Sequence, residues 1–178
     1  MSQQFVYHLV PEQMHGNMLF PLNRLREVAP AVAAIAYQKY EGREVLLKTR
    51  IPPLDCLWND VLMFCPVHPR HIMQTFREEG YNLRPRRWFE VPLSRFEPAC
   101  TAVFFSKIRP YGDFAMPDDA FAMLSDVDFE SLTHFPDALR QHIGQARAEN
   151  RRPFMFVGVP HILYRGTLLL DGIDVEEF

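Results

Sequence analysis

The segment from Trp58 to Pro69 constrains the fold most, because it encloses a short apolar run between polar and proline residues. The apolar run, Val61 to Cys65, has the length of a strand and is too short for a typical helix. Asn59 and Asp60 come directly before it, and prolines end it abruptly. Polar groups at the end of a buried strand are held rigidly, which is where binding sites are commonly built. The segment therefore predicts a site on a scaffold of strands and helices.

Length and composition indicate one globular domain covering residues 1–178. No internal repeat, low-complexity tract or linker divides the chain. The 15 Phe, 6 Tyr and 2 Trp predict a core rich in aromatic rings, and such rings also line pockets for planar ligands. A net charge of −3 argues against a broad nucleic-acid-coating surface, although it permits a local basic patch.

Three cysteines, Cys56, Cys65 and Cys100, show no CxxC spacing, and the first residues do not resemble a secretory signal. No window reaches the ~18 apolar residues of a membrane span. We therefore expect a cytoplasmic protein with no membrane partner.

The order of elements predicts an α+β domain rather than a doubly wound sheet, because strands and helices do not alternate regularly. Strands are expected at 5–10, 61–65, 88–91 and 102–105, followed by a β-rich tail at 154–157, 162–164 and 167–170. Helices are expected at 24–28 with Asn23 as the cap, 30–40, 69–79, 137–149, and from Asp118 or Asp119 through 120–124. Residues 43–50 fit helix or strand, and 51–54 should be extended.

Several chemistries are excluded by missing motifs. The chain has no GxSxG, GxxxxGK[ST] or GxGxxG, so it is not a P-loop nucleotidase or a Rossmann dehydrogenase. It also lacks HExxH and zinc-finger spacing, and no metal site is predicted. His68 and His71 would share one side of a helix. A metal-dependent hydrolase that uses them with another His is therefore a minor hypothesis beside a simple helix start.

Two basic patches could hold an anionic partner. Arg84, Arg86 and Arg87 lie beside an indole, and Arg151-Arg152 precede a phenylalanine. Guanidinium groups match phosphate oxygens and stack on planar rings, so such a set could grip an anionic or base-containing ligand, and the first patch is the stronger of the two. The alternative for both is a solvated loop.

Five pieces of the chain, taken in order, resemble the DarT-type ADP-ribosyltransferases, which use NAD to modify DNA bases. These pieces are 6–9 (VYHL), 60–66 (DVLMFCP), 103–106 (VFFS), 124–129 (LSDVDF) and the tail 168–175. The resemblance implies small β-sheets split around an NAD cleft, with flanking helices. It also implies a toxin or defence factor that modifies nucleic acid, a partner that Arg84, Arg86 and Arg87 would help to bind.

The resemblance assigns roles to individual residues. His8 would hold the nicotinamide-side ribose of NAD, and His161 is a further candidate for binding it. Asn59 and Asp60 would line the nicotinamide end. The family's basic residue falls at Arg43 or Arg50, which would pair with pyrophosphate or orient the catalytic carboxylate.

The chain departs from the family at the catalytic glutamate. The family carries it at the start of a strand, where this chain reads RPFMFV at 152–157. Glu149, four or five residues earlier, is the nearest candidate base. A carboxylate is needed to stabilise the positive charge that develops on the ribose when the glycosidic bond breaks. The alternative hypothesis is therefore a module that binds a nucleotide or a protein partner without catalysis.

Overall fold

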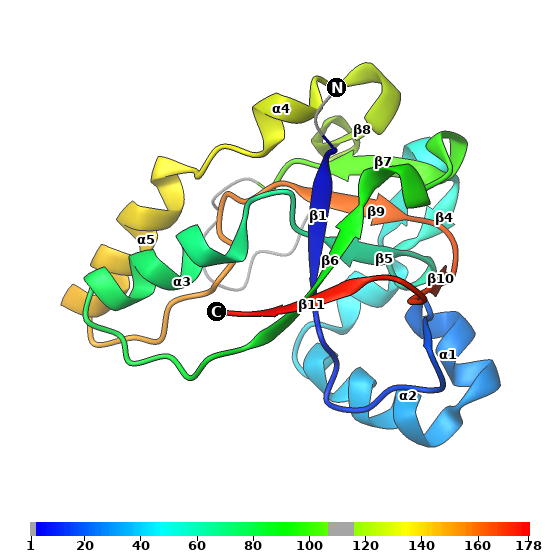
Figure 1. The fold of residues 1–178 in the computed structure, drawn as a ribbon, viewed down its shortest axis with the longest axis horizontal. Coiled ribbons are helices and arrows are strands. Elements are labelled where there is room, and N and C mark those ends of the chain that lie inside the picture. Colours follow the sequence, from blue (N-terminus) through cyan, green and yellow to red (C-terminus); the bar gives the residue numbers. More distant parts are fainter. Residues whose placement is uncertain (1–2, 107–115) are drawn as a thin grey trace.

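The computed structural model describes residues 3–106 and 116–178 and confirms an α+β fold with several small antiparallel sheets. Two sheets organise the molecule, and Figure 1 shows the first running across the front of the second. The first has the order β1-β6-β11 and contains β1 (Phe5–Leu9), β6 (Arg87–Pro92) and β11 (Asp174–Glu177). The second has the order β5-β9-β7-β8 and contains β5 (Leu62–Phe64), β9 (His161–Tyr164), β7 (Thr101–Phe104) and β8 (Phe121–Met123).

A backbone bridge ties the two sheets together. Tyr7 in β1 and Cys65, just after β5, exchange two hydrogen bonds, each 2.8 Å from nitrogen to oxygen. Because neighbouring residues in a strand point to opposite faces, this bridge also fixes where the side chain of His8 lies. The bridge thus sets one wall of the site described below.

Helices flank the sheets on two sides, with α3 and α5 together on one side and α1 and α2 on the other (Figure 1). The helices are α1 (Leu22–Val28), α2 (Pro30–Tyr37), α3 (Pro69–Glu78), α4 (Phe129–Leu132) and α5 (Asp137–Ala148). Two short antiparallel pairs complete the fold, β2 (Met18–Leu19) with β10 (Leu168–Leu169) and β3 (Arg50–Ile51) with β4 (Cys56–Leu57). Within the described ranges, no helix has the length and apolar character needed to cross a membrane.

Local sequence explains the elements that were predicted correctly. The strand expected at 61–65 forms as β5, with Leu62 and Phe64 buried and pairing to β9. Helix α3 begins at Pro69, buries Ile72 and Phe76 on one face, and is followed by a glycine in the left-handed region. The strands at 5–10, 88–91, 102–105, 162–164 and 167–170 and the helices at 30–40 and 137–149 also form, with small shifts at their ends.

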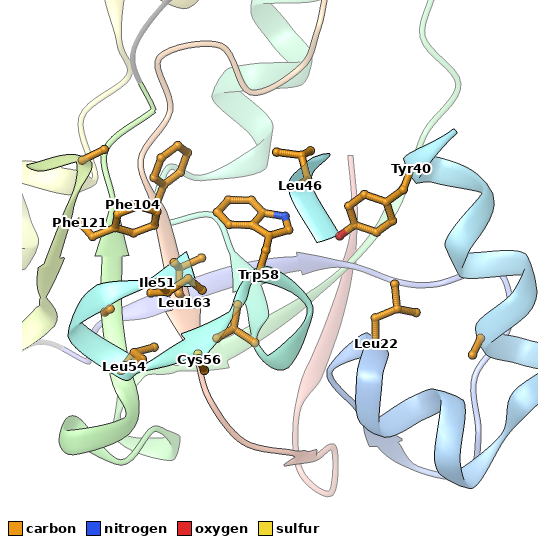
Figure 2. Close-up of a cluster of buried hydrophobic side chains, with 14 residues drawn as sticks. Leu22, Tyr40, Leu46, Ile51, Leu54, Cys56, Trp58, Phe104, Phe121 and Leu163 are labelled. Carbon is orange, nitrogen blue, oxygen red and sulfur yellow. The ribbon is translucent and has the colours of Figure 1, made fainter. Parts of the chain in front are cut away.

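One core cluster packs around Trp58, and Figure 2 shows its indole between Phe104 and Tyr40. The Trp58 and Phe104 ring centroids are 5.3 Å apart in an edge-to-face arrangement, a favourable geometry for two quadrupoles. Leu163 from β9 packs in the same cluster and is fully buried. This cluster joins the second sheet to the α1–α2 side of the molecule.

Four sequence predictions are wrong. Residues 118–124 form a single 3-10 turn and then β8, because Phe121 pairs with Phe104 of β7 and is buried there. Residues 154–157 form turns rather than a strand, and Gly158 follows with φ +72°. Residues 52–54 form a 3-10 turn, since their two prolines cannot donate to a strand ladder.

The fourth concerns the cap of α1. Asn23 lies inside the helix, which begins at Leu22 after Pro21. Its side-chain amide instead donates to Asp60, 2.7 Å away. Strand β11, short helix α4 and pair β2–β10 have no strong local pattern, and only β10 was expected.

Candidate functional site

A cleft opens between β1, α2 and the end of β5. It consists of an outer cavity of about 600 Å³ and an adjoining inner cavity of about 190 Å³. The two cavities share nine lining residues: His8, Pro11, Gln13, Val32, Ala36, Lys39, Tyr40, Trp58 and Met63. Pockets for small molecules commonly have this size and a largely apolar wall with few polar groups.

His8 forms a polar point on the wall that β1 contributes. Its Nδ1 lies 2.8 Å from the carbonyl oxygen of Met63, and its ring contacts Phe64 with centroids 5.2 Å apart. Burial lowers the pKa of His8 to about 4, and Lys39 nearby adds to this. The imidazole is therefore neutral at neutral pH. Because a carbonyl oxygen only accepts, Nδ1 carries the hydrogen and Nε2 is left as an acceptor.

Basic groups lie along the edge of the cleft that follows α2. Lys39 Nζ and the Arg43 guanidinium carbon lie 5.1 and 5.9 Å from the centroid of the Tyr40 ring. Packing around the ammonium group lowers the pKa of Lys39, and the neighbouring guanidinium adds to this, although the residue as a whole is exposed. Arg43 also donates through Nε to the carbonyl oxygen of Lys39, at 3.0 Å. This edge is suited to an anionic group.

Three polar atoms of the described residues are buried without a hydrogen-bond partner, and all three belong to residues that line the cleft. They are the side-chain oxygen Oδ1 of Asn59, the indole nitrogen Nε1 of Trp88 and the imidazole nitrogen Nδ1 of His161. Burial lowers the pKa of His161 to about 4, so this ring is also neutral. Buried polar groups normally have hydrogen-bond partners, and each group left without one destabilises the folded protein. Their gathering at one cleft indicates a place where a ligand supplies the missing partners.

The predicted site residues divide into two sets. His8, Arg43, Asn59 and His161 come together at the cleft. Asp60, next to Asn59, does not line either cavity. Its carboxylate accepts hydrogen bonds from the Leu57 backbone N–H, at 2.9 Å, and from Asn23, and so holds the turn that carries Asn59.

Arg50 and Glu149 lie away from the cleft. Arg50 is exposed and pairs with Asp55 across the β3–β4 hairpin. Glu149 is exposed at the end of α5, where it accepts from Arg151 at 2.5 Å and from Gln145 at 2.9 Å. These hydrogen bonds lower the pKa of Glu149, so it stays ionised on the surface. Among the described lining residues the one carboxylate is Glu12, which is exposed in the loop after β1.

The histidine pair considered for metal binding serves the start of α3. Nδ1 of His68 accepts from the Arg70 backbone N–H at 3.2 Å, and the His68 and His71 ring centroids are 5.9 Å apart. Across residues 3–106 and 116–178, no group of three His, Cys, Asp or Glu side chains has the arrangement to hold a metal ion.

A second hollow, of about 820 Å³, lies beside α3 and the segment after α5. It brings together Arg86 from the first basic patch and Arg151 and Arg152 from the second, with Tyr81 and Phe154 as ring surfaces. We call this hollow the basic groove. Arg84 and Arg87 are exposed and do not line it.

Sequence reasoning missed several lining residues of the cleft. Lys39 and Tyr40 were not singled out for a site, and Trp58 was named only as the start of the segment that ends at Pro69. Trp88 was noted only as a neighbour of arginines. Trp58 directly precedes Asn59, which is the one local signal that could have found it.

Comparison with protein-family models, with curated proteins and with solved structures finds no match to this chain.

Proposed function

We propose that the protein binds a nucleotide-type ligand in the cleft, with NAD as the first candidate. The main support is that three buried polar atoms without hydrogen-bond partners lie at this cleft, one each from Asn59, Trp88 and His161. A nucleotide carries hydrogen-bonding groups, planar rings and phosphates in one molecule. The cleft offers a counterpart to each of these.

Rings and cations supply the complementary contacts. Tyr40, Trp58 and Phe156 line the cleft and present faces or edges to a planar ring. Lys39 and Arg43 supply positive charge for phosphate oxygens, and Arg43 does so with a planar fork. The outer cavity is in the size range of small-molecule pockets and is large enough for a ligand with several rings.

The cleft supports binding better than ADP-ribosyl transfer. Transfer needs a carboxylate beside the reacting ribose, because the breaking bond leaves positive charge there. Glu149 lies on the surface, where it pairs with Arg151. Among the described residues that line the cleft, the one carboxylate is the exposed Glu12. Of the two sequence hypotheses, we therefore favour the binding module without catalysis.

Calorimetric titration with NAD tests the proposal. Lys39→Gln and Arg43→Gln should each weaken binding by about three- to tenfold, as expected for a partly exposed charged hydrogen bond. Arg50→Gln removes the same charge outside the cleft and serves as the matched control. Glu149→Gln should leave the affinity unchanged. Absence of saturable binding at millimolar NAD would contradict the proposal.

A second candidate function is binding of single-stranded nucleic acid in the basic groove, supported by the meeting of Arg86 with Arg152 beside the rings of Tyr81 and Phe154. A labelled oligonucleotide should bind more weakly to Arg86→Gln and Arg152→Gln, with a shallower salt dependence. Arg84→Gln is the control, since it removes an equal charge from the same loop outside the groove. Equal losses in all three variants would indicate a diffuse charge effect and contradict the groove.

A further inference from the structure

The Phe156 ring contacts the rings of two residues that each have a buried nitrogen without a hydrogen-bond partner. Its ring centroid lies 6.2 Å from that of Trp88 and 5.6 Å from that of His161, with interplanar angles of 82° and 73°. All three residues line the outer cavity. Trp88 Nε1 and His161 Nδ1 are both buried without a hydrogen-bond partner.

The missing partner of these two nitrogens has a definite chemistry. An indole N–H can only donate, and Trp88 is 1% exposed, so bulk water does not reach it. A neutral imidazole with its hydrogen on Nδ1 also donates. With that tautomer each of the two nitrogens donates to an acceptor oxygen, such as that of a phosphate or an amide carbonyl.

The backbone around Phe156 permits its side chain to move. Phe156 is half-buried within the turns of residues 155–158, between α5 and β9. The turn is held on one side by the Phe154 N–H, which donates to His142 Nε2 at 3.1 Å. On the other side the Val159 N–H donates to the Phe156 carbonyl at 3.2 Å. The side chain is half-buried, packs at the border of a core cluster and contacts the Trp88 and His161 rings, but it makes none of these hydrogen bonds, so it can be displaced without breaking them.

We propose that Trp88 Nε1 and His161 Nδ1 form a subsite for acceptor oxygens of the ligand, which the Phe156 ring covers until the ligand displaces it. The identity of the natural ligand rests on the proposed function. The subsite adds to that function the part of the cleft involved and the chemical group that it recognises. Lys39 and Arg43 line the same cavity and would favour an anionic oxygen, whereas an amide carbonyl would rely on the two donors alone.

Nuclear magnetic resonance of the ¹⁵N-labelled indole groups tests the subsite directly. The chain has two tryptophans, so Trp58→Phe assigns the Trp88 Nε1–H signal. Inorganic pyrophosphate probes the phosphate source and benzamide the carbonyl source. One of the two should shift the Trp88 signal saturably, and the one that does so identifies the kind of oxygen.

Variants test the roles of the individual residues. Phe156→Ala should tighten binding of the active probe about tenfold, because the covering ring no longer has to move. His161→Phe should weaken it three- to tenfold while preserving a ring of similar size. Phe154→Ala is the matched control, since it removes a ring from the same segment on the basic-groove side.

The outcomes separate the subsite from the proposed function. If NAD binds by calorimetry but no probe, NAD included, moves the Trp88 signal, the subsite is wrong and the cleft proposal stands. If pyrophosphate or benzamide moves the signal and NAD does not bind, the subsite stands and NAD is the wrong ligand. If Phe156→Ala and Phe154→Ala change the affinity equally, Phe156 does not cover the subsite.

Discussion

Acid should destabilise the protein through the two histidines that line the cleft. Burial lowers the pKa of both His8 and His161 to about 4, against 6.5 for an unperturbed imidazole. Between these values the unfolded chain binds more protons than the folded protein. The free energy of unfolding therefore falls as the pH falls through this window, and the full stability is present above pH 6.5.

The size of the effect follows from the two pKa shifts. One pKa unit corresponds to about 1.4 kcal/mol, so a fully enclosed imidazole would lose about 3 kcal/mol across the window. Because both residues retain partial solvent exposure, we expect about 2 kcal/mol for each. Burial also lowers the pKa of His68 and His142, which adds to the loss in the same direction.

Urea unfolding at a series of pH values between about 7 and about 4.5 measures this slope. The lower limit keeps most surface carboxylates ionised. His8→Gln and His161→Gln should each flatten the dependence of unfolding free energy on pH. His134→Gln is the control, because it removes an exposed histidine that does not line the cleft. A slope that is the same in the wild type and in both cleft variants would refute the reasoning.

Two further predictions concern stability. Leu163→Ala, at a fully buried position of the central strand β9, should cost about 3 kcal/mol in urea unfolding, whereas Leu169→Ala, 45% exposed, should cost under about 1 kcal/mol. Equal costs would contradict the assignment of β9 to the core. Gly158→Ala should destabilise more than Gly42→Ala, by about 1 kcal/mol, as judged by thermal unfolding. Both glycines have positive φ, but an added Cβ meets Ala138 at 3.2 Å only at Gly158. Equal losses would show that backbone strain alone matters.

Local sequence was enough for the elements whose pattern is strong over a short range. The apolar run at 61–65 between polar residues and prolines predicts β5, and Pro69 with an apolar face and a closing glycine predicts α3. Residues 121–123 form a strand because β7 lies beside them, and that neighbour is invisible to a local pattern. Residues 154–157 have strand-like composition but are turned aside between α5 and β9.

For the site, the sequence by itself determined which residue types were available: histidines, arginines and an asparagine at the start of a strand. Tertiary structure alone decided which of them meet. His8, Lys39, Trp88 and His161 come from four segments far apart in the chain, and strand register and the Tyr7–Cys65 bridge bring those segments together. Asp60 and Asn59 are adjacent, yet one supports the turn and the other lines the cleft. Tertiary structure also decided the properties of these side chains, because a shifted pKa or an unpaired polar atom arises only from the neighbours that folding places around a residue.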